Sequence, residues 1–155
     1  MSHHLIGVIS DTHGLLRPEA VEALVGVEHI LHAGDIGAPE VLTALAAIAP
    51  VTAVRGNNDR FPGAGDIPET AAVQIGNHWF YVLHDLHDLD LDPRAAGFAA
   101  VIAGHSHRPV IEEKHGVLFV NPGSAGPRRF KLPVAVARMR IRGGVVTAEV
   151  VSLPC

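Results

Sequence analysis

Three apolar runs of strand length follow one another in the first third of the chain. The first two are each followed by a Pro-Glu pair, a typical helix start, and by apolar residues at helical spacing. Near-continuous apolar runs are typical of strands covered on both faces. The order of strand and helix predicts parallel βαβ units and an α/β fold. The expected strands are 5–9, 30–33 and 51–54, and the expected helices 18–25 and 39–48.

The remainder of the chain predicts hairpins rather than helices. The change follows a Pro- and Gly-rich surface loop at 61–68, and Gly76-Asn77 then separates two strand-like runs. The chain has 155 residues, of which 48% are hydrophobic and 18% charged. This length and composition predict one folded domain spanning 1–155. The further strands expected are 71–75, 78–83, 99–103, 117–120, 133–141 and 145–151, with one short capped helix at 92–97.

Charge and cysteine content exclude several classes of protein. The net charge of -4 makes a nucleic-acid partner or an anionic membrane unlikely. Arg138, Arg140 and Arg142 alternate with apolar residues and lack aromatic neighbours, so we interpret them as the exposed face of an edge strand. The single cysteine, Cys155, excludes an internal disulfide. With no signal segment and no apolar run of about 18 residues, the expected location is cytoplasmic.

Side chains able to bind a metal follow one predicted strand after another. Asp11 with His13, and His105 with His107, stand two residues apart, so each pair points to one side of an extended segment. Each motif alone is more often a turn or a polar loop, and His32, inside its strand, is interpreted as a packed residue. Together they offer a mixed nitrogen and oxygen donor set without thiolates, which suits Mn, Fe, Zn, Co or Ni. The seven candidates are Asp11, His13, Asp35, Asn57, His84, His105 and His107.

These motifs, in this order, resemble the calcineurin-like metallophosphoesterase superfamily. The compact length and Asn121-Pro122-Gly123-Ser124 are similar to its small YfcE-like phosphodiesterase branch. The motifs that carry the resemblance are Asp11-x-His13, Gly34-Asp35, Gly56-Asn57-x-Asp59, His84 and Gly104-His105-Ser106-His107.

The resemblance implies a four-layer αββα sandwich of two mixed sheets with two divalent metal ions at one rim. Manganese is the first choice, with Fe, Zn, Ni and Co as alternatives. The implied reaction is hydrolysis of a small phosphoester, most simply a phosphodiester, by in-line attack of a metal-bridging hydroxide. The first ion would take Asp11, His13, Asp35 and His107, and the second Asp35, Asn57, His84 and His105, so that Asp35 bridges them.

Two departures from the family pattern bear on catalysis. Many relatives carry a histidine, thought to protonate the leaving group, where this chain has Asn58, and an amide cannot supply a proton. Relatives also have glycine after the metal-binding histidine, whereas this chain has Asp85. We prefer His84 to His87 as the ligand because His84 follows the strand directly, and we interpret His87 as a solvated loop residue.

Further expectations concern the catalytic residues, the contacts with substrate and the partners. Asp59 could orient Asn57, so the candidate catalytic set is Asp35, Asn57, Asn58 and Asp59. Arg55 and Arg128, or Arg129 in its place, could approach the substrate phosphate, since a guanidinium matches two phosphate oxygens. The alternative function is a protein-interaction scaffold of the same fold, like a retromer subunit. A third function, a nuclease, would need a basic groove, which the charge pattern does not clearly offer. A homo-oligomer is left open.

Overall fold

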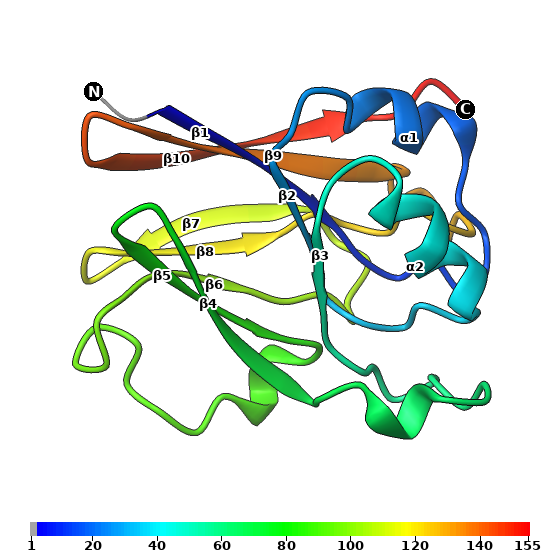
Figure 1. Ribbon diagram of the computed structural model, residues 1–155, viewed down its shortest axis with the longest axis horizontal. Helices are drawn as coiled ribbons and strands as arrows, with labels where there is room; N and C mark the ends of the chain where they lie inside the picture. Colours follow the sequence, from blue (N-terminus) through cyan, green and yellow to red (C-terminus); the bar gives the residue numbers. More distant parts are fainter. Residues whose placement is uncertain (1–2) are drawn as a thin grey trace.

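The computed structural model describes residues 3–155, which form two five-stranded mixed sheets facing each other (Figure 1). Met1 and Ser2 of the expected domain lie outside these residues. The order in the first sheet is β10-β9-β1-β2-β3, and in the second β4-β5-β6-β8-β7. The strands of the first sheet are β1 (His3–Ile9), β2 (His29–His32), β3 (Val51–Ala53), β9 (Ala135–Arg142) and β10 (Val145–Ser152). Those of the second are β4 (Thr70–Ile75), β5 (His78–Leu83), β6 (Phe98–Ile102), β7 (Val110–Lys114) and β8 (Val117–Asn121).

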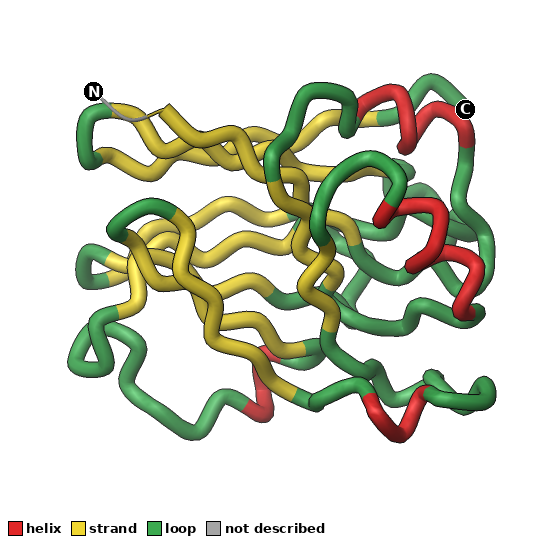
Figure 2. Tube along the Cα trace, in the orientation of Figure 1, coloured by secondary structure: helices red, strands yellow, loops and turns green. Residues whose placement is uncertain are grey.

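The predicted parallel βαβ units are present. β1, β2 and β3 pair in parallel, and two α-helices, α1 (Pro18–Ala23) and α2 (Pro39–Ala46), connect them. Figure 2 shows both helices on the same side of the strands. Each begins with proline at its first turn and buries small or aliphatic side chains against Ile9 and Ile30 of the first sheet. The helices thus cover the outer face of that sheet.

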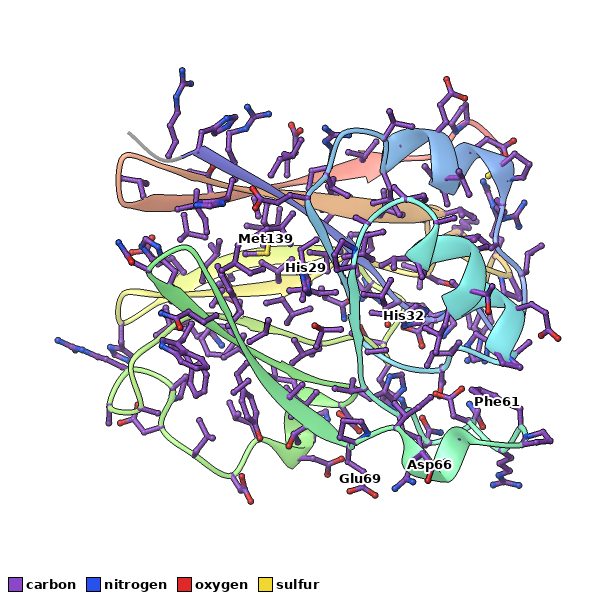
Figure 3. The ribbon with its side chains drawn as sticks, viewed as in Figure 1. His29, His32, Phe61, Asp66, Glu69 and Met139 are labelled. Carbon is purple, nitrogen blue, oxygen red and sulfur yellow. The ribbon has the colours of Figure 1, made fainter. Side chains whose placement is uncertain are left out.

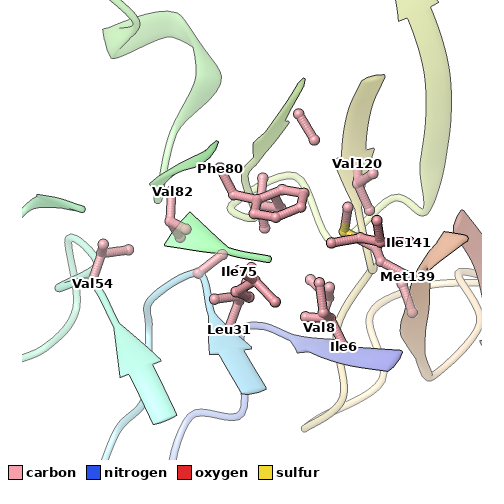
Figure 4. Close-up of a cluster of buried hydrophobic side chains, with 14 residues drawn as sticks. Ile6, Val8, Leu31, Val54, Ile75, Phe80, Val82, Val120, Met139 and Ile141 are labelled. Carbon is pink, nitrogen blue, oxygen red and sulfur yellow. The ribbon is translucent and has the colours of Figure 1, made fainter. Parts of the chain in front are cut away.

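The main core lies between the two sheets. Alternate residues of β1 divide between the two faces: Ile6 and Val8 point into the core, whereas Ile9 points towards the helices. Figure 4 shows Leu31 from the first sheet and Phe80 from the second in the same buried cluster. This packing holds the ends of both sheets at one rim, which is where the polar motifs lie.

The outer face of the second sheet departs from the prediction. The expected helix at 92–97 is wrong: this segment forms hydrogen-bonded turns, in which the Asp92 carboxylate accepts from the backbone N–H groups of Arg94 and Ala95. The Asp92 carboxylate thereby stabilises a turn, which is the alternative that an aspartate side chain offers to a helix. Instead, Leu89 and Leu91 of the loop between β5 and β6 pack on this face. The fourth layer of the sandwich is therefore a loop with one 3-10 turn, η2 (Leu86–Asp88).

The arginine-rich strand is also placed differently from the prediction. β9 lies between β10 and β1, so it is an inner strand, and β10 forms the edge. Arg138 donates to the carbonyl oxygen of Ala23, the last residue of α1, at 2.6 Å. The arginine thereby satisfies a carbonyl that the end of a helix leaves without a partner.

The connecting loops complete the description of residues 3–155. The predicted loop at 61–68 contains a 3-10 turn, η1 (Ala64–Asp66). None of the helices among residues 3–155 is long and apolar enough to cross a membrane.

Candidate metal centre

Loops that follow five strands meet at one rim of the sandwich. They follow β1, β2, β3, β5 and β6, and backbone hydrogen bonds join the loop after β1 to that after β2 and the loop after β5 to that after β6: Asp11 N–H donates to the carbonyl of Gly34, and Gly104 N–H donates to the carbonyl of His84. Carboxyl ends of parallel strands are where open α/β sheets place their sites. The structure therefore brings together polar residues that are up to about a hundred positions apart in the sequence.

Asp11 provides the strongest indication of a cation site. Its Oδ2 atom accepts hydrogen bonds from the Ser10 hydroxyl at 2.7 Å and from His105 N–H at 3.1 Å. Its Oδ1 atom is buried and has no hydrogen-bond donor among residues 3–155. Three imidazole Nε2 atoms face that oxygen, at 3.4 Å from His107, 3.8 Å from His13 and 3.9 Å from His84. A buried carboxylate oxygen left bare among nitrogen donors fits a metal ion, which would satisfy all of them.

Asp35 lies between two groups of candidate ligands. Its Oδ2 atom is 3.3 Å from His84 Nε2 and 3.7 Å from His13 Nε2. The ligand atoms of Asp11, His13 and His107 lie within 4.8 Å of one another, as do those of Asp11, Asp35 and His84. A carboxylate in this position can contact ions in both groups, as a bridging ligand must.

Hydrogen bonds outside the cluster orient these ligands. His84 donates from Nδ1 to the carbonyl of Ala33 at 2.7 Å, which leaves the Nε2 lone pair facing the carboxylates. Asn58 donates to Asp35 twice, from its backbone N–H at 2.9 Å and from its side-chain amide at 3.0 Å. His84 is thus held through the ring nitrogen that faces away from the carboxylates, and Asp35 is held through both of its oxygens.

Backbone strain is concentrated at the same residues. Asp11, His13, Asp35, His105 and His107 all have a φ angle between 47° and 71°, the left-handed region that residues with a Cβ rarely adopt. Such strain persists where the surrounding structure imposes it and clusters at functional sites. The strand ends therefore place these side chains at a cost in conformational energy.

Charge around the cluster favours ionised carboxylates. Burial raises the pKa of Asp11, but the neighbouring His107 imidazole and the hydrogen bond from Ser10 outweigh it and lower the pKa below the usual value. Burial likewise opposes ionisation of Asp35, yet the nearby His84 imidazole and the hydrogen bonds from Asn58 hold its pKa well below the ordinary range. For His84, burial lowers the pKa, but the nearby Asp35 carboxylate raises it overall. Two negative charges are thus available for cations at neutral pH.

The structure places the other two candidate ligands at a cavity of about 830 Å³ that opens beside the cluster. Asn57 is exposed and lines this cavity together with His105, whose side chain is 45% exposed. The His105 ring stands edge-on to that of His84, with 5.2 Å between the ring centroids. The predicted ligands therefore form a group of five, four buried and His13 half-buried, with His105 and Asn57 on the solvent side.

The family assignment follows from the comparison of the whole sequence. It matches the calcineurin-like phosphoesterase superfamily domain over residues 5–144. The chain belongs to this superfamily. It is 38% identical to a "Probable metallophosphoesterase" of Methanothermobacter thermautotrophicus, over 95% of this chain and 91% of that protein. It is 30% identical to a phosphodiesterase of Methanocaldococcus jannaschii, over 76% of this chain and 82% of that protein.

A structural comparison confirms the predicted fold. Vacuolar Protein Sorting 29 from Cryptosporidium parvum superposes with a TM-score of 0.77 and covers 97% of this chain and 98% of its own. With 23% sequence identity, this similarity shows that the fold is shared and nothing further. The family predicted from the motifs is therefore confirmed, and superfamily membership implies divalent metal ions.

Several residues around the superfamily motifs lie elsewhere than expected. Asp59 does not orient the side chain of Asn57: its carboxylate accepts from the backbone N–H groups of Gly56 and Gly37, at 2.8 and 2.9 Å, and so fixes the loop. Arg55 lines the cavity of about 830 Å³ and pairs there at 2.7 Å with Glu69, which is labelled in Figure 3. Arg128 donates to the carbonyl of Cys155 at 2.6 Å and is not among the described residues that line this cavity.

Sequence reasoning identified some supporting residues and missed others. Asn121, the first residue of the Asn121-Pro122-Gly123-Ser124 motif, supports the rim: its amide donates to the Gly104 carbonyl and the Ser106 hydroxyl. Ser10 was missed, although a hydroxyl directly before Asp11 is a local signal. Asp85 was also missed as a partner: its Oδ2 lies 3.7 Å from His105 Nε2.

The choice between the two histidines near β5 agrees with the structure. The His84 side chain is 5% exposed and faces the carboxylates, whereas that of His87 is 95% exposed and contacts Asp85 at 3.1 Å. His87 therefore lies in solvent, as predicted from its place in the loop.

Substitution of Gly104 by alanine is expected to weaken Mn²⁺ binding by about 10- to 100-fold, the usual effect of displacing the support of a ligand. A Cβ atom at Gly104 would overlap the Ser10 hydroxyl and lie 2.7 Å from Asp11 Oδ2. Titration calorimetry measures the affinity. Gly65→Ala is the matched control, because a Cβ there meets nothing within 4 Å. Equal affinities for the two variants would contradict this account of Asp11.

His32 is buried beneath these loops as a neutral imidazole (Figure 3). Its Nδ1 atom accepts from Gly34 N–H at 3.1 Å, and its Nε2 atom pairs with the Thr12 hydroxyl at 3.1 Å. Thr12 itself donates to the carbonyl of Ile36, so Nε2 carries the proton. Burial lowers the pKa of His32 from 6.5 to about 4. The prediction that this histidine is packed rather than ligating agrees with these contacts.

Acidification of the metal-free protein is expected to lower the free energy of unfolding as the pH falls from 6.5 to about 4. The unfolded chain binds a proton on His32 near pH 6.5 and the folded chain only near 4, so stability is complete above 6.5. The loss amounts to about 3 kcal/mol at most. Denaturant unfolding across this interval should show a smaller pH dependence for His32→Asn, whose Oδ1 can still accept from Gly34. The same dependence in both proteins would refute the assignment.

Proposed function

We propose that this protein is a metal-dependent phosphodiesterase that hydrolyses a small phosphodiester. The observation that carries the proposal is the bare, buried Oδ1 atom of Asp11, which faces three imidazole nitrogens beside the ionised carboxylate of Asp35. The similarity to a phosphodiesterase of Methanocaldococcus jannaschii supports the choice of substrate class.

We assign the candidate ligands to two ions, with manganese as the first choice. Divalent ions in such a site lower the pKa of water and neutralise charge that develops at phosphorus. Asp35 belongs to both sets because it lies between His13 and His84. The first set is Asp11, His13, Asp35 and His107, and the second is Asp35, Asn57, His84 and His105.

The remaining residues of the site position these ligands and the substrate. Ser10 and the backbone of His105 occupy one oxygen of Asp11, so that the other faces the cations. Asn58 holds both oxygens of Asp35, one through its backbone N–H and one through its side-chain amide, but it offers no acidic proton to a leaving group. Arg55 lies at the cavity, where a guanidinium can bind two phosphate oxygens if it exchanges Glu69 for substrate. Substrates with acidic leaving groups should therefore react best.

The test is hydrolysis of bis(p-nitrophenyl) phosphate and of p-nitrophenyl phosphate by protein that has been stripped of metal and reloaded with Mn²⁺. We expect metal-dependent hydrolysis of the diester, faster than that of the monoester, and loss of this activity in His105→Ala. His115→Ala is the matched control, since His115 is exposed at the turn between β7 and β8. Failure of the metal-loaded protein to cleave either ester would overturn the proposal.

The alternative role, a protein-interaction scaffold, remains a competing hypothesis because Vacuolar Protein Sorting 29 has the same fold. A scaffold needs no set of oriented metal ligands, and here hydrogen bonds position Asp11, Asp35 and His84. The metal content of the purified protein separates the two. A protein that binds no Mn²⁺ at these residues would favour the scaffold.

A further inference from the structure

A second cavity, of about 300 Å³, lies on the outer face of the second sheet beside the candidate metal centre. Its walls are mainly apolar and come from strands β6, β7 and β8 and from the turn η2. This is the part of the sheet that Leu89 and Leu91 of the covering loop leave open. The apolar side chains that line it are Leu86, Val101, Ala103, Val110 and Phe119.

This apolar cavity and the larger polar cavity meet at the candidate centre. Asp85 and His105 line both of them, and Gly104 and Ser106 of the same loop line the apolar one. The polar cavity on the other side carries charged residues, among them Arg55 and Arg60. A phosphate held at His105 would therefore have an apolar space on one side and a polar space on the other.

The charged groups of the apolar cavity are already engaged. Lys114 Nζ lies 5.6 Å from the centroid of the Phe119 ring and 3.8 Å from Glu112 Oε2. The Lys114 ammonium group thus already contacts Phe119 and Glu112, which lie on the same sheet. The apolar side chains of this cavity thus offer dispersion contacts to a ligand.

We propose that the apolar cavity binds an aromatic or aliphatic ester group of the substrate, while the second ester group lies in the polar cavity. The inference rests on the proposed function, since it places the reacting phosphate at the candidate metal centre. A volume of 300 Å³ accommodates a single ring, and the burial of a ring against Val110 and Phe119 should strengthen binding about tenfold or more. The preferred substrates are then unsymmetrical phosphodiesters with one apolar group.

Binding of phosphonates tests this inference without turnover. Phenylphosphonate and methylphosphonate carry the same anionic head at a pH where both are dianions, and they differ only in the apolar group. We expect titration calorimetry on Mn²⁺-loaded protein to give at least about tenfold tighter binding for phenylphosphonate.

Two neighbouring residues of β7 provide a matched pair of variants. Val110 lines the cavity and is 38% exposed, whereas Ile111 is 37% exposed and, one residue along the strand, points to the other face. Val110→Gln should reduce the preference for phenylphosphonate several-fold, and Ile111→Gln should leave it unchanged. Both positions are open to solvent, so neither substitution should prevent folding.

The outcomes separate this inference from the proposed function. Equal affinity for the two phosphonates, or an unchanged preference in Val110→Gln, overturns the inference, and diester hydrolysis by the same protein would leave the proposed function standing. A preserved preference for phenylphosphonate in protein that hydrolyses no diester supports the cavity assignment and contradicts only the proposed reaction. Failure of both phosphonates to bind the Mn²⁺-loaded protein overturns the inference.

Discussion

Asp35→Asn is expected to lower kcat/KM for bis(p-nitrophenyl) phosphate by at least about 10³-fold while the fold persists. The substitution keeps the shape of the side chain but removes the negative charge between His13 and His84. Ligands that hold catalytic metal ions contribute several kcal/mol to transition-state stabilisation, and each 1.4 kcal/mol is about a factor of ten in rate. The measurement is steady-state hydrolysis by Mn²⁺-reloaded protein.

Metal content and unfolding temperature must accompany this rate. The variant should bind less Mn²⁺ than the unaltered protein, and the metal-free forms should unfold at similar temperatures, because the backbone N–H of Asn58 can still donate to the new amide oxygen. Asp66→Asn, in the exposed turn η1, is the matched control and should retain both metal and activity. Full activity in an Asp35→Asn protein that binds Mn²⁺ poorly would contradict the assignment of the centre.

The parallel half of the fold could be predicted because its signals are local. Each apolar run of the βαβ units has the length and composition of a strand, and Pro18 and Pro39 mark the helix starts. The ends of these strands then locate Asp11 and Asp35 without any tertiary information. The candidate ligands can be located because parallel strands place their carboxyl ends at one rim of the sheet.

Contacts between residues that are far apart in the sequence could not be predicted from local patterns. The hydrogen bond from His105 N–H to Asp11 joins residues 94 positions apart, and no local pattern specifies which carboxylate oxygen it occupies. The Asp59 carboxylate binds Gly37 rather than Asn57 for the same reason. The loop that replaces the helix expected at 92–97 was missed because Asp92 starts a turn as readily as a helix.

The position of β9 within its sheet could not be predicted either. Alternation of Arg138, Arg140 and Arg142 with apolar residues correctly indicated one face towards polar surroundings, but it could not distinguish an edge strand from an inner one. β10 pairs with the whole length of β9, and Arg138 bonds to a helix terminus instead of solvent. Pairing partners are set by the complete sheet, so a single strand does not encode them.

Asn58→His is expected to increase hydrolysis of phosphoesters with poor leaving groups by about 10²-fold. Asn58 is exposed, and its amide lies 3.0 Å from Asp35 Oδ2, at the position where relatives are thought to carry an acidic histidine. An imidazole there can bond to Asp35 through one nitrogen and present a proton from the other. General acid catalysis typically contributes about 10²- to 10⁴-fold. The measurement compares alkyl and p-nitrophenyl esters of the same phosphate.

The dependence on the leaving group distinguishes proton donation from a change in metal binding. The p-nitrophenyl ester needs little protonation and should gain little, whereas a change in metal affinity would alter both rates alike. The gain for the alkyl ester should also decline as the pH rises above about 6.5, where an ordinary histidine loses its proton. Asn58→Gln is the control, because it keeps an amide without an acidic proton. If Asn58→His and Asn58→Gln hydrolyse the alkyl ester equally, Asn58 only positions Asp35, and the leaving group departs without help from this loop.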